Sequence, residues 1–173
     1  MLYASCKQYL IVKLKEAGIK TRPYTTRKAL EKCMESHVGA VIFERETNVR
    51  NGSKKRFIDP VGAQHKRRKV LDRDITFSVI IGEYSDDAAE TIFERFLSLL
   101  DAGLYVDGNF VSIDFEGSEW VDTDDSILKA KVAVQTFITF HGGLYLDTGF
   151  APLRHIEVKE IEKSTRKEPV NGK

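Results

Sequence analysis

Three stretches of the chain place apolar residues at the three- and four-residue spacing of an amphipathic helix. The strongest covers Asp86–Asp101, with Ser85 placed to cap it and acidic residues at its positively charged start. The other two predicted helices cover Leu2–Ala17, which Gly18 ends, and Arg27–Ser36. The apolar stripe of the strongest helix comprises Ala89, Ile92, Phe93, Phe96, Leu99 and Leu100.

Other stretches show the alternation or the β-branched content of strands. We expect strands at Val38–Phe43, Ile75–Ile81 and Leu128–Phe140, the last broken by Gly142-Gly143. Two short apolar runs flank Asp107-Gly108-Asn109 and predict a hairpin there. The pattern predicts an α+β fold, in which one mainly antiparallel sheet carries an amphipathic helix packed on one face, beside an N-terminal helix.

The length of 173 residues suits a single domain with a real core. We place that domain at residues 1–148 and a C-terminal extension at 149–173, whose last ten residues are expected to fray. Residues 46–69 carry no clear period and are rich in basic side chains, so they are predicted to form a projecting polar and basic arm. The acidic stretch Glu116–Asp125, which holds the single tryptophan, is expected to be a loop.

The net charge of +1 hides two poles of opposite sign. Residues 1–82 hold 18 Lys+Arg against 8 Asp+Glu, a net of +10, whereas residues 83–125 hold 13 acids and one basic residue, a net of −12. Poles of this kind attract copies of the same chain to one another when they lie on different surfaces. Pairing within one chain would look identical in the sequence.

Motifs of common enzymes are absent from the sequence: it contains no GxGxxG, GxxxxGK[ST], HExxH or GxSxG. The paired acids Asp86-Asp87 and Asp124-Asp125 are interpreted as the start of a helix and the start of a strand, and not as a cation site. Cys6 and Cys33 lack metal-ligand spacing and are interpreted as small core residues. The four histidines stand apart from acids and nucleophiles, so we expect no catalytic residues, no metal and no cofactor.

Ten basic residues lie between Arg45 and Arg73, a density that phosphate contacts require. A nucleic-acid-binding module that uses this 45–73 segment is therefore the alternative function. Phe57 is the one aromatic residue interleaved among these cations, which is too few for a stacking platform. The other use of a basic arm is docking onto a protein, and a head-to-tail ring sets one surface of a subunit against a different surface of its neighbour.

The order of these elements resembles that of the phage tail-terminator, or tail-completion, family over roughly residues 5–141. The strand Asp74-Ile75-Thr76-Phe77-Ser78-Val79-Ile80-Ile81 followed by the helix after Ser85 is similar to the family's central unit. Lys131-Val132-Ala133-Val134-Gln135-Thr136-Phe137 resembles its final strand.

The resemblance implies a structural virion protein of the tail or neck, assembled in the host cytoplasm, with no catalysis, cofactor or small-molecule substrate. It implies a hexameric ring of copies that caps the tail tube, ends its polymerisation and meets the tube protein and the neck, connector or sheath proteins. DNA would at most pass through the lumen, and no membrane is involved. The resemblance does not distinguish a flexible tail from a contractile tail or a headless tailocin.

The charged residues that we expect at the interface between subunits, or with the tube, come from both poles. On the basic arm they are Arg56, Lys66, Arg67 and Arg68, and on the acidic side they are Glu90, Glu94, Asp122 and Asp124.

Overall fold

The structure is a computed structural model that describes residues 1–122 and 132–150. Its elements in chain order are α1 (Leu2–Ala17), α2 (Arg27–Leu30), β1 (Val38–Arg50), β2 (Lys54–Ile58), β3 (Gln64–Glu83), α3 (Asp86–Leu99), β4 (Gly103–Val106), β5 (Asn109–Asp122) and β6 (Val132–Gly149). No helix among these residues is long and apolar enough to cross a membrane.

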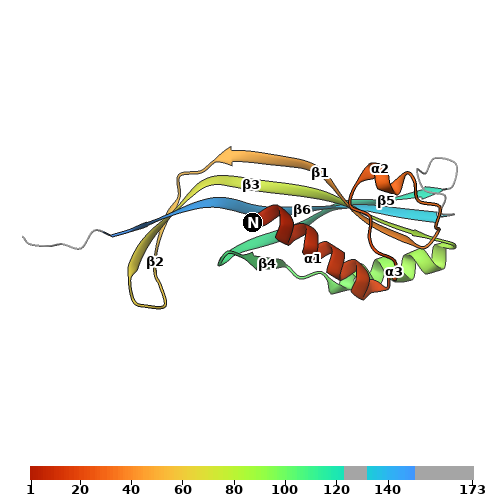
Figure 1. The fold of residues 1–173 in the computed structure, drawn as a ribbon, viewed down its shortest axis with the longest axis horizontal. Coiled ribbons are helices and arrows are strands. Elements are labelled where there is room, and N and C mark those ends of the chain that lie inside the picture. The colour runs from red at the N-terminus through yellow and green to blue at the C-terminus, as the bar shows by residue number, and fades with distance from the viewer. Residues whose placement is uncertain (123–131, 151–173) are drawn as a thin grey trace, which may run out of the picture.

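All six strands belong to one sheet with the order β1-β3-β6-β5-β4, and β2 pairs with β3 outside this path. Every pairing between these strands is antiparallel. The expectation of an α+β fold built on a mainly antiparallel sheet is therefore confirmed. The sheet is long and narrow because β3 and β6 run side by side for most of their length, as Figure 1 shows.

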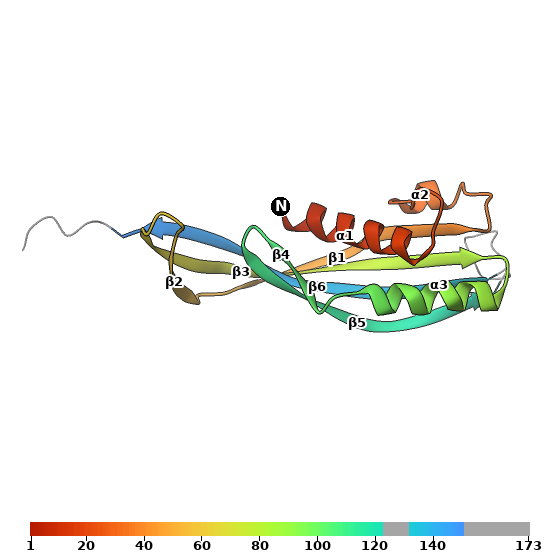
Figure 2. The same ribbon diagram turned by 90° about the horizontal axis from the view of Figure 1, so that it is seen from below.

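Helices α1 and α3 lie on one face of the sheet (Figure 2). Between them and the strands is the main core, in which Phe77, Phe96 and Phe140 are fully buried. The cap of α3 forms as predicted, since the Ser85 hydroxyl accepts a hydrogen bond from the Ala88 N–H at 3.4 Å. The apolar stripe that predicted this helix is the surface that it buries.

The opposite face is covered in part by α2, which is much shorter than the predicted helix Arg27–Ser36. Thr26 caps α2, but the helix ends at Leu30 and the chain turns so that Cys33 enters a second core cluster. A four-residue helix has little stability of its own, so the packing of this turn against β1 decides where it ends. Both cysteines are buried free thiols, which agrees with their interpretation as core residues.

Strand β3 has 20 residues and is far longer than the predicted Ile75–Ile81. Its first part pairs with β2, so most of residues 46–69, for which a projecting arm was expected, is regular β-structure. The acidic stretch expected to be a loop is also a strand as far as Asp122, because β5 pairs with β6 up to that residue. Residues 123–125 of that stretch lie outside the described residues, as do the predicted strand start at 128–131 and residues 151–173 of the extension.

The glycines Gly142 and Gly143 do not end the last strand, since β6 continues through them to Gly149. A Cβ atom at Gly142 would lie 2.6 Å from Leu2 Cδ2, and one at Gly143 would lie 2.4 Å from Lys69 Cε. The pair therefore allows α1 and a neighbouring side chain to approach the strand closely. Glycine in a strand often has this role rather than that of a breaker.

The predicted hairpin is present between β4 and β5, where Val106 pairs with Asn109. Asp107 and Gly108 form its two-residue turn, and both have positive φ angles, of 50° and 73°. Two positive φ values are the mark of a type I′ turn, which the Asp-Gly sequence favours.

Candidate functional site: two charged surfaces

The basic part of the chain forms a three-stranded ribbon at one end of the molecule, which we call the distal ribbon. It consists of β2, residues 64–69 of β3 and residues 145–149 of β6. Figure 1 shows it at the end of the long sheet that lies away from α3. Residues directly opposite each other in an antiparallel sheet share a face, so the pairing register assigns each cation to one side of the ribbon.

One side carries four exposed cations in two opposed pairs, and we call it the cation face. Lys54 lies opposite Arg68, and Arg56 lies opposite Lys66. None of the four forms an ion pair with another described residue. Like charges placed directly opposite each other destabilise a sheet. The cation face therefore costs the folded chain stability unless an anionic partner offsets the repulsion.

The other side of the ribbon is largely neutralised within the chain. The Arg67 guanidinium donates hydrogen bonds of 2.7 and 2.6 Å to both carboxylate oxygens of Asp147, and one of 2.9 Å to the Asn109 side chain. It also lies over the Phe57 ring, 4.7 Å from the ring centre. These hydrogen bonds from Arg67 hold the pKa of Asp147 below its ordinary value.

Two further basic groups on the second side also face carboxylates. His65 Nε2 lies 2.9 Å from Asp59 Oδ2, and the Lys69 ammonium pairs with Asp72. Lys55 is the exception, because it is exposed and pairs with no described acid. The contrast between the two sides shows that this chain has acids available to neutralise cations, yet leaves the cation face without them.

The acidic candidates lie on α3 and at the end of β5. Glu90 and Glu94 are exposed on α3 one helical turn apart, and neither forms an ion pair with a described residue. Asp86 and Asp87 extend the same acidic surface at the helix start. We call these four residues the acidic face of α3. Asp122 lies opposite Val132 in the sheet, and Asp124 lies outside the described residues.

The structure thus groups the predicted interface residues into two separate sets. Arg56, Lys66 and Arg68 share the cation face, while Arg67 points to the other side and is engaged within the chain. The interface role predicted for Arg67 stays a prediction. Lys54 completes the cation face but was absent from the predicted set, although strand alternation in Lys54-Lys55-Arg56 is the signal that assigns it.

The His141 imidazole lies between two carboxylates on the sheet face away from α1 and α3. His141 Nδ1 lies 2.9 Å from Asp74 Oδ1, and its Nε2 lies 3.0 Å from Asp114 Oδ2. Because carboxylates occupy both ring nitrogens, the imidazole has no nitrogen left to accept a proton from a nucleophile. Within residues 1–122 and 132–150, no group of three or more His, Cys, Asp and Glu side chains is arranged to hold a metal ion.

Comparison of the chain with models of protein families finds no match, and a comparison with curated proteins finds none either.

Proposed function

We propose that this chain is a structural subunit of a phage tail or a related particle, one that acts like a tail terminator. It assembles head to tail into a ring that caps the tail tube, ends tube polymerisation and joins the neck, head or sheath. The observation that carries this proposal is the pair of charged surfaces, the cation face and the acidic face of α3, at separate places on one elongated chain.

The separation of the two surfaces favours contacts between copies over contacts within one copy. Figure 1 places the distal ribbon and α3 toward opposite ends of the sheet, so their charges cannot meet inside a monomer. A contact between two unlike surfaces is heterologous, and heterologous contacts close into rings when the rotation between subunits allows it. Opposite charges at such a contact set its register and speed the encounter.

Within this proposal the charged residues have different roles. Arg56, Lys66 and Arg68 contact Glu90 and Glu94 of the adjacent copy. Arg67 instead fixes the ribbon in place, through Asp147 on β6 and through Asn109 at the tip of the β4–β5 hairpin. Asp122 and Asp124 remain candidate partners of the same basic surface.

A charge-swap experiment on the full chain tests the contact directly. One variant carries Arg56→Glu with Arg68→Glu, and the other carries Glu90→Lys with Glu94→Lys. Each variant alone presents like charges at the contact, so each is expected to stay monomeric by native mass spectrometry at physiological salt. A mixture of the two restores opposite charges at both kinds of junction and is expected to assemble with alternating subunits.

The matched control is Lys55→Glu, which removes a cation from the same ribbon but on its other side. It is expected to assemble as the wild-type chain does. Failure of the mixture to assemble, or a wild-type chain that stays monomeric at its highest soluble concentration, would overturn the head-to-tail contact.

Nucleic-acid binding is the second candidate, because the cation face also suits phosphates. Four cations that neutralise four phosphates give log Kobs a slope of about −3.6 against log salt on duplex DNA. Binding of wild-type protein with that slope, lost in the Arg56→Glu and Arg68→Glu variant but kept in Lys55→Glu, would favour this candidate over ring assembly.

A further inference from the structure

The outer edge of β6 is open along the distal ribbon. β5 pairs with β6 only as far as Ser112, which lies opposite His141. Beyond that point, residues 142–149 of β6 pair with β3 and with no other described strand. Leu144 and Leu146 on this segment are 49% and 56% exposed. An open edge with exposed apolar side chains is a template for the addition of another strand.

Two other open edges of the sheet carry features that oppose pairing with a strand of another molecule. β1 contains a bulge between Phe43 and Arg45, and β5 contains one between Phe115 and Ser118 and carries acids, although its segment Ser118–Asp122 beyond the bulge is in regular register. Bulges and charges are the usual means of blunting an edge. By contrast, residues 142–149 contain no Lys, Arg or Pro, and their one acid, Asp147, is held by Arg67.

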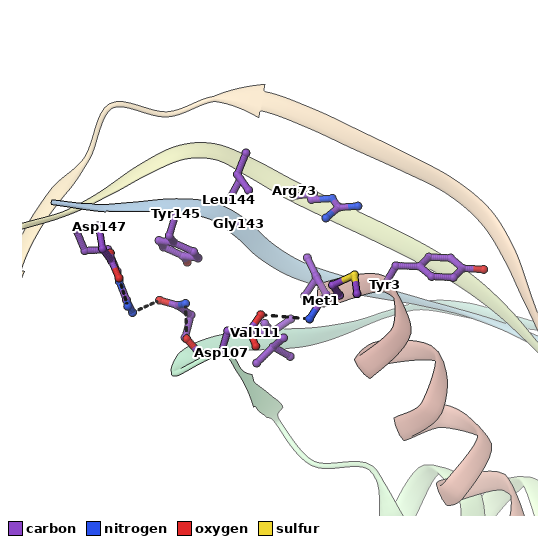
Figure 3. A pocket seen from close by; sticks show the side chains of 13 residues that line it. Met1, Tyr3, Arg73, Asp107, Val111, Gly143, Leu144, Tyr145 and Asp147 are labelled. Carbon is purple, nitrogen blue, oxygen red and sulfur yellow. Dashed lines mark hydrogen bonds and ion pairs between the residues drawn. The ribbon is translucent and has the colours of Figure 1, made fainter. Parts of the chain in front are cut away.

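A hollow of about 470 Å³ lies beside this edge, on the sheet face that carries α1 and α3. Figure 3 shows the Tyr145 side chain pointing from β6 toward it and that of Leu144 pointing the other way, with Val111 from the β4–β5 hairpin and Met1 from the start of α1 on other sides. Apolar side chains line much of it, and the guanidinium groups of Arg67 and Arg73 also face it. The combination of apolar walls and cations suits an aromatic side chain, which attracts a guanidinium to its ring face.

The acidic edge of β5 supplies such side chains. Phe115 lies opposite the core residue Ile138, and the Trp120 ring packs edge to face against Phe93 of α3, so both point to the α3 side of the sheet. They are still 50% and 48% exposed. Both are large aromatic residues, which dominate the energetics of interfaces when a partner buries them. Asp114, Glu116 and Glu119 alternate with them along the strand.

We propose that the β5 edge of one copy adds to the β6 edge, residues 142–149, of the next copy, and that its Trp120 enters the hollow beside Tyr145. The proposal rests on the head-to-tail assembly described above and names the strands that form the junction. The acids of β5 deter pairing between two β5 edges, but they complement the basic distal ribbon.

The geometry of a head-to-tail junction agrees with this pairing. Subunits related by rotation in a ring keep equivalent faces of a joined sheet on the same side. The Trp120 ring and the hollow both lie on the face that carries α3, so the ring points toward the hollow when the strands join. Asp114 and Glu119, which alternate with these aromatic residues, point to the opposite face of the joined sheet, the face on which the adjacent ribbon carries its cation face.

The test uses the intrinsic fluorescence of Trp120, which is the only tryptophan in the chain. The full-length protein is diluted through its association range, and native mass spectrometry follows its mass. Assembly is expected to shift Trp120 emission to shorter wavelength and to protect it from acrylamide quenching. An assembled protein whose Trp120 stays as accessible to acrylamide as in the monomer would overturn the strand pairing while leaving ring assembly intact.

Leu144→Asp provides the second arm of the test, because Leu144 is half-exposed in the monomer and its replacement leaves the core intact. It is expected to weaken self-association about 30-fold or more, as the loss of a central interface contact does. The control Met34→Ala removes another exposed side chain, in the connection between α2 and β1 at the opposite edge of the sheet, and is expected to leave association unchanged. Equal association of Leu144→Asp and wild type would reject the junction.

Discussion

Replacement of Phe96 by alanine measures how much α3 depends on the sheet beneath it. The Phe96 side chain is fully buried in the main core. An aromatic side chain buries 150–250 Å², and at about 25 cal/mol per Å² this burial contributes at most roughly 4–6 kcal/mol to the free energy of unfolding. We therefore expect Phe96→Ala to lower that free energy by about 3–5 kcal/mol, in line with other aromatic truncations in cores.

Urea denaturation followed by circular dichroism gives the free energy of unfolding of wild type and variant. For a chain of this length, a loss of 3–5 kcal/mol lowers the melting temperature by about 6–20 °C. The matched control is Glu94→Ala, an exposed position on the same helix, for which we expect a change within about 0.5 kcal/mol. A loss below about 1 kcal/mol for Phe96→Ala would mean that α3 does not pack through this face.

Two further predictions concern the backbone and the pH dependence of stability. Gly103→Ala places a Cβ atom 2.4 Å from the Val111 carbonyl oxygen, so it should cost at least about 1–3 kcal/mol in denaturant, whereas Gly52→Ala, with open space around it, should not destabilise the chain. Asp147→Asn should lower the free energy of unfolding by less than about 1 kcal/mol at neutral pH, because this pair is partly exposed. The pKa of Asp147 is lowered on folding, so its contribution is present above the unfolded value of about 3.9 and is lost as pH falls through the folded value. The gap between wild type and Asp147→Asn should therefore close in acid, and a gap that persists at low pH would contradict this assignment.

Local signals in the sequence determined the elements whose stabilising features lie close together in the chain. The spacing of Leu2, Cys6 and Leu10 predicted α1, and both of its ends are as expected. The cap and stripe of α3 predicted that helix to within two residues at its end, and the Asp-Gly turn predicted the β4–β5 hairpin. Each of these signals acts over a few residues, so no knowledge of the rest of the chain is required.

The strand ends were not predictable in this way. β6 passes through Gly142 and Gly143 because β3 is its neighbour along the whole length, and β5 includes acidic residues because β6 pairs with them. In both cases hydrogen bonds to a distant strand stabilise a conformation that the local sequence does not favour. The same pairing turns much of the basic region into the regular distal ribbon.

The same distinction between local sequence and long-range pairing applies to the candidate site. The sequence by itself established that the chain has a basic and an acidic region, and which residues contribute to each. The tertiary structure decided that Arg67 is neutralised by Asp147 while Arg68, its neighbour in sequence, points to the other side without an ion pair among the described residues. Adjacent residues of a strand point to opposite faces, and which face finds an acid depends on the strand that pairs beside it. Charge is fixed by composition, whereas the neutralisation of charge is fixed by the neighbours that folding brings together.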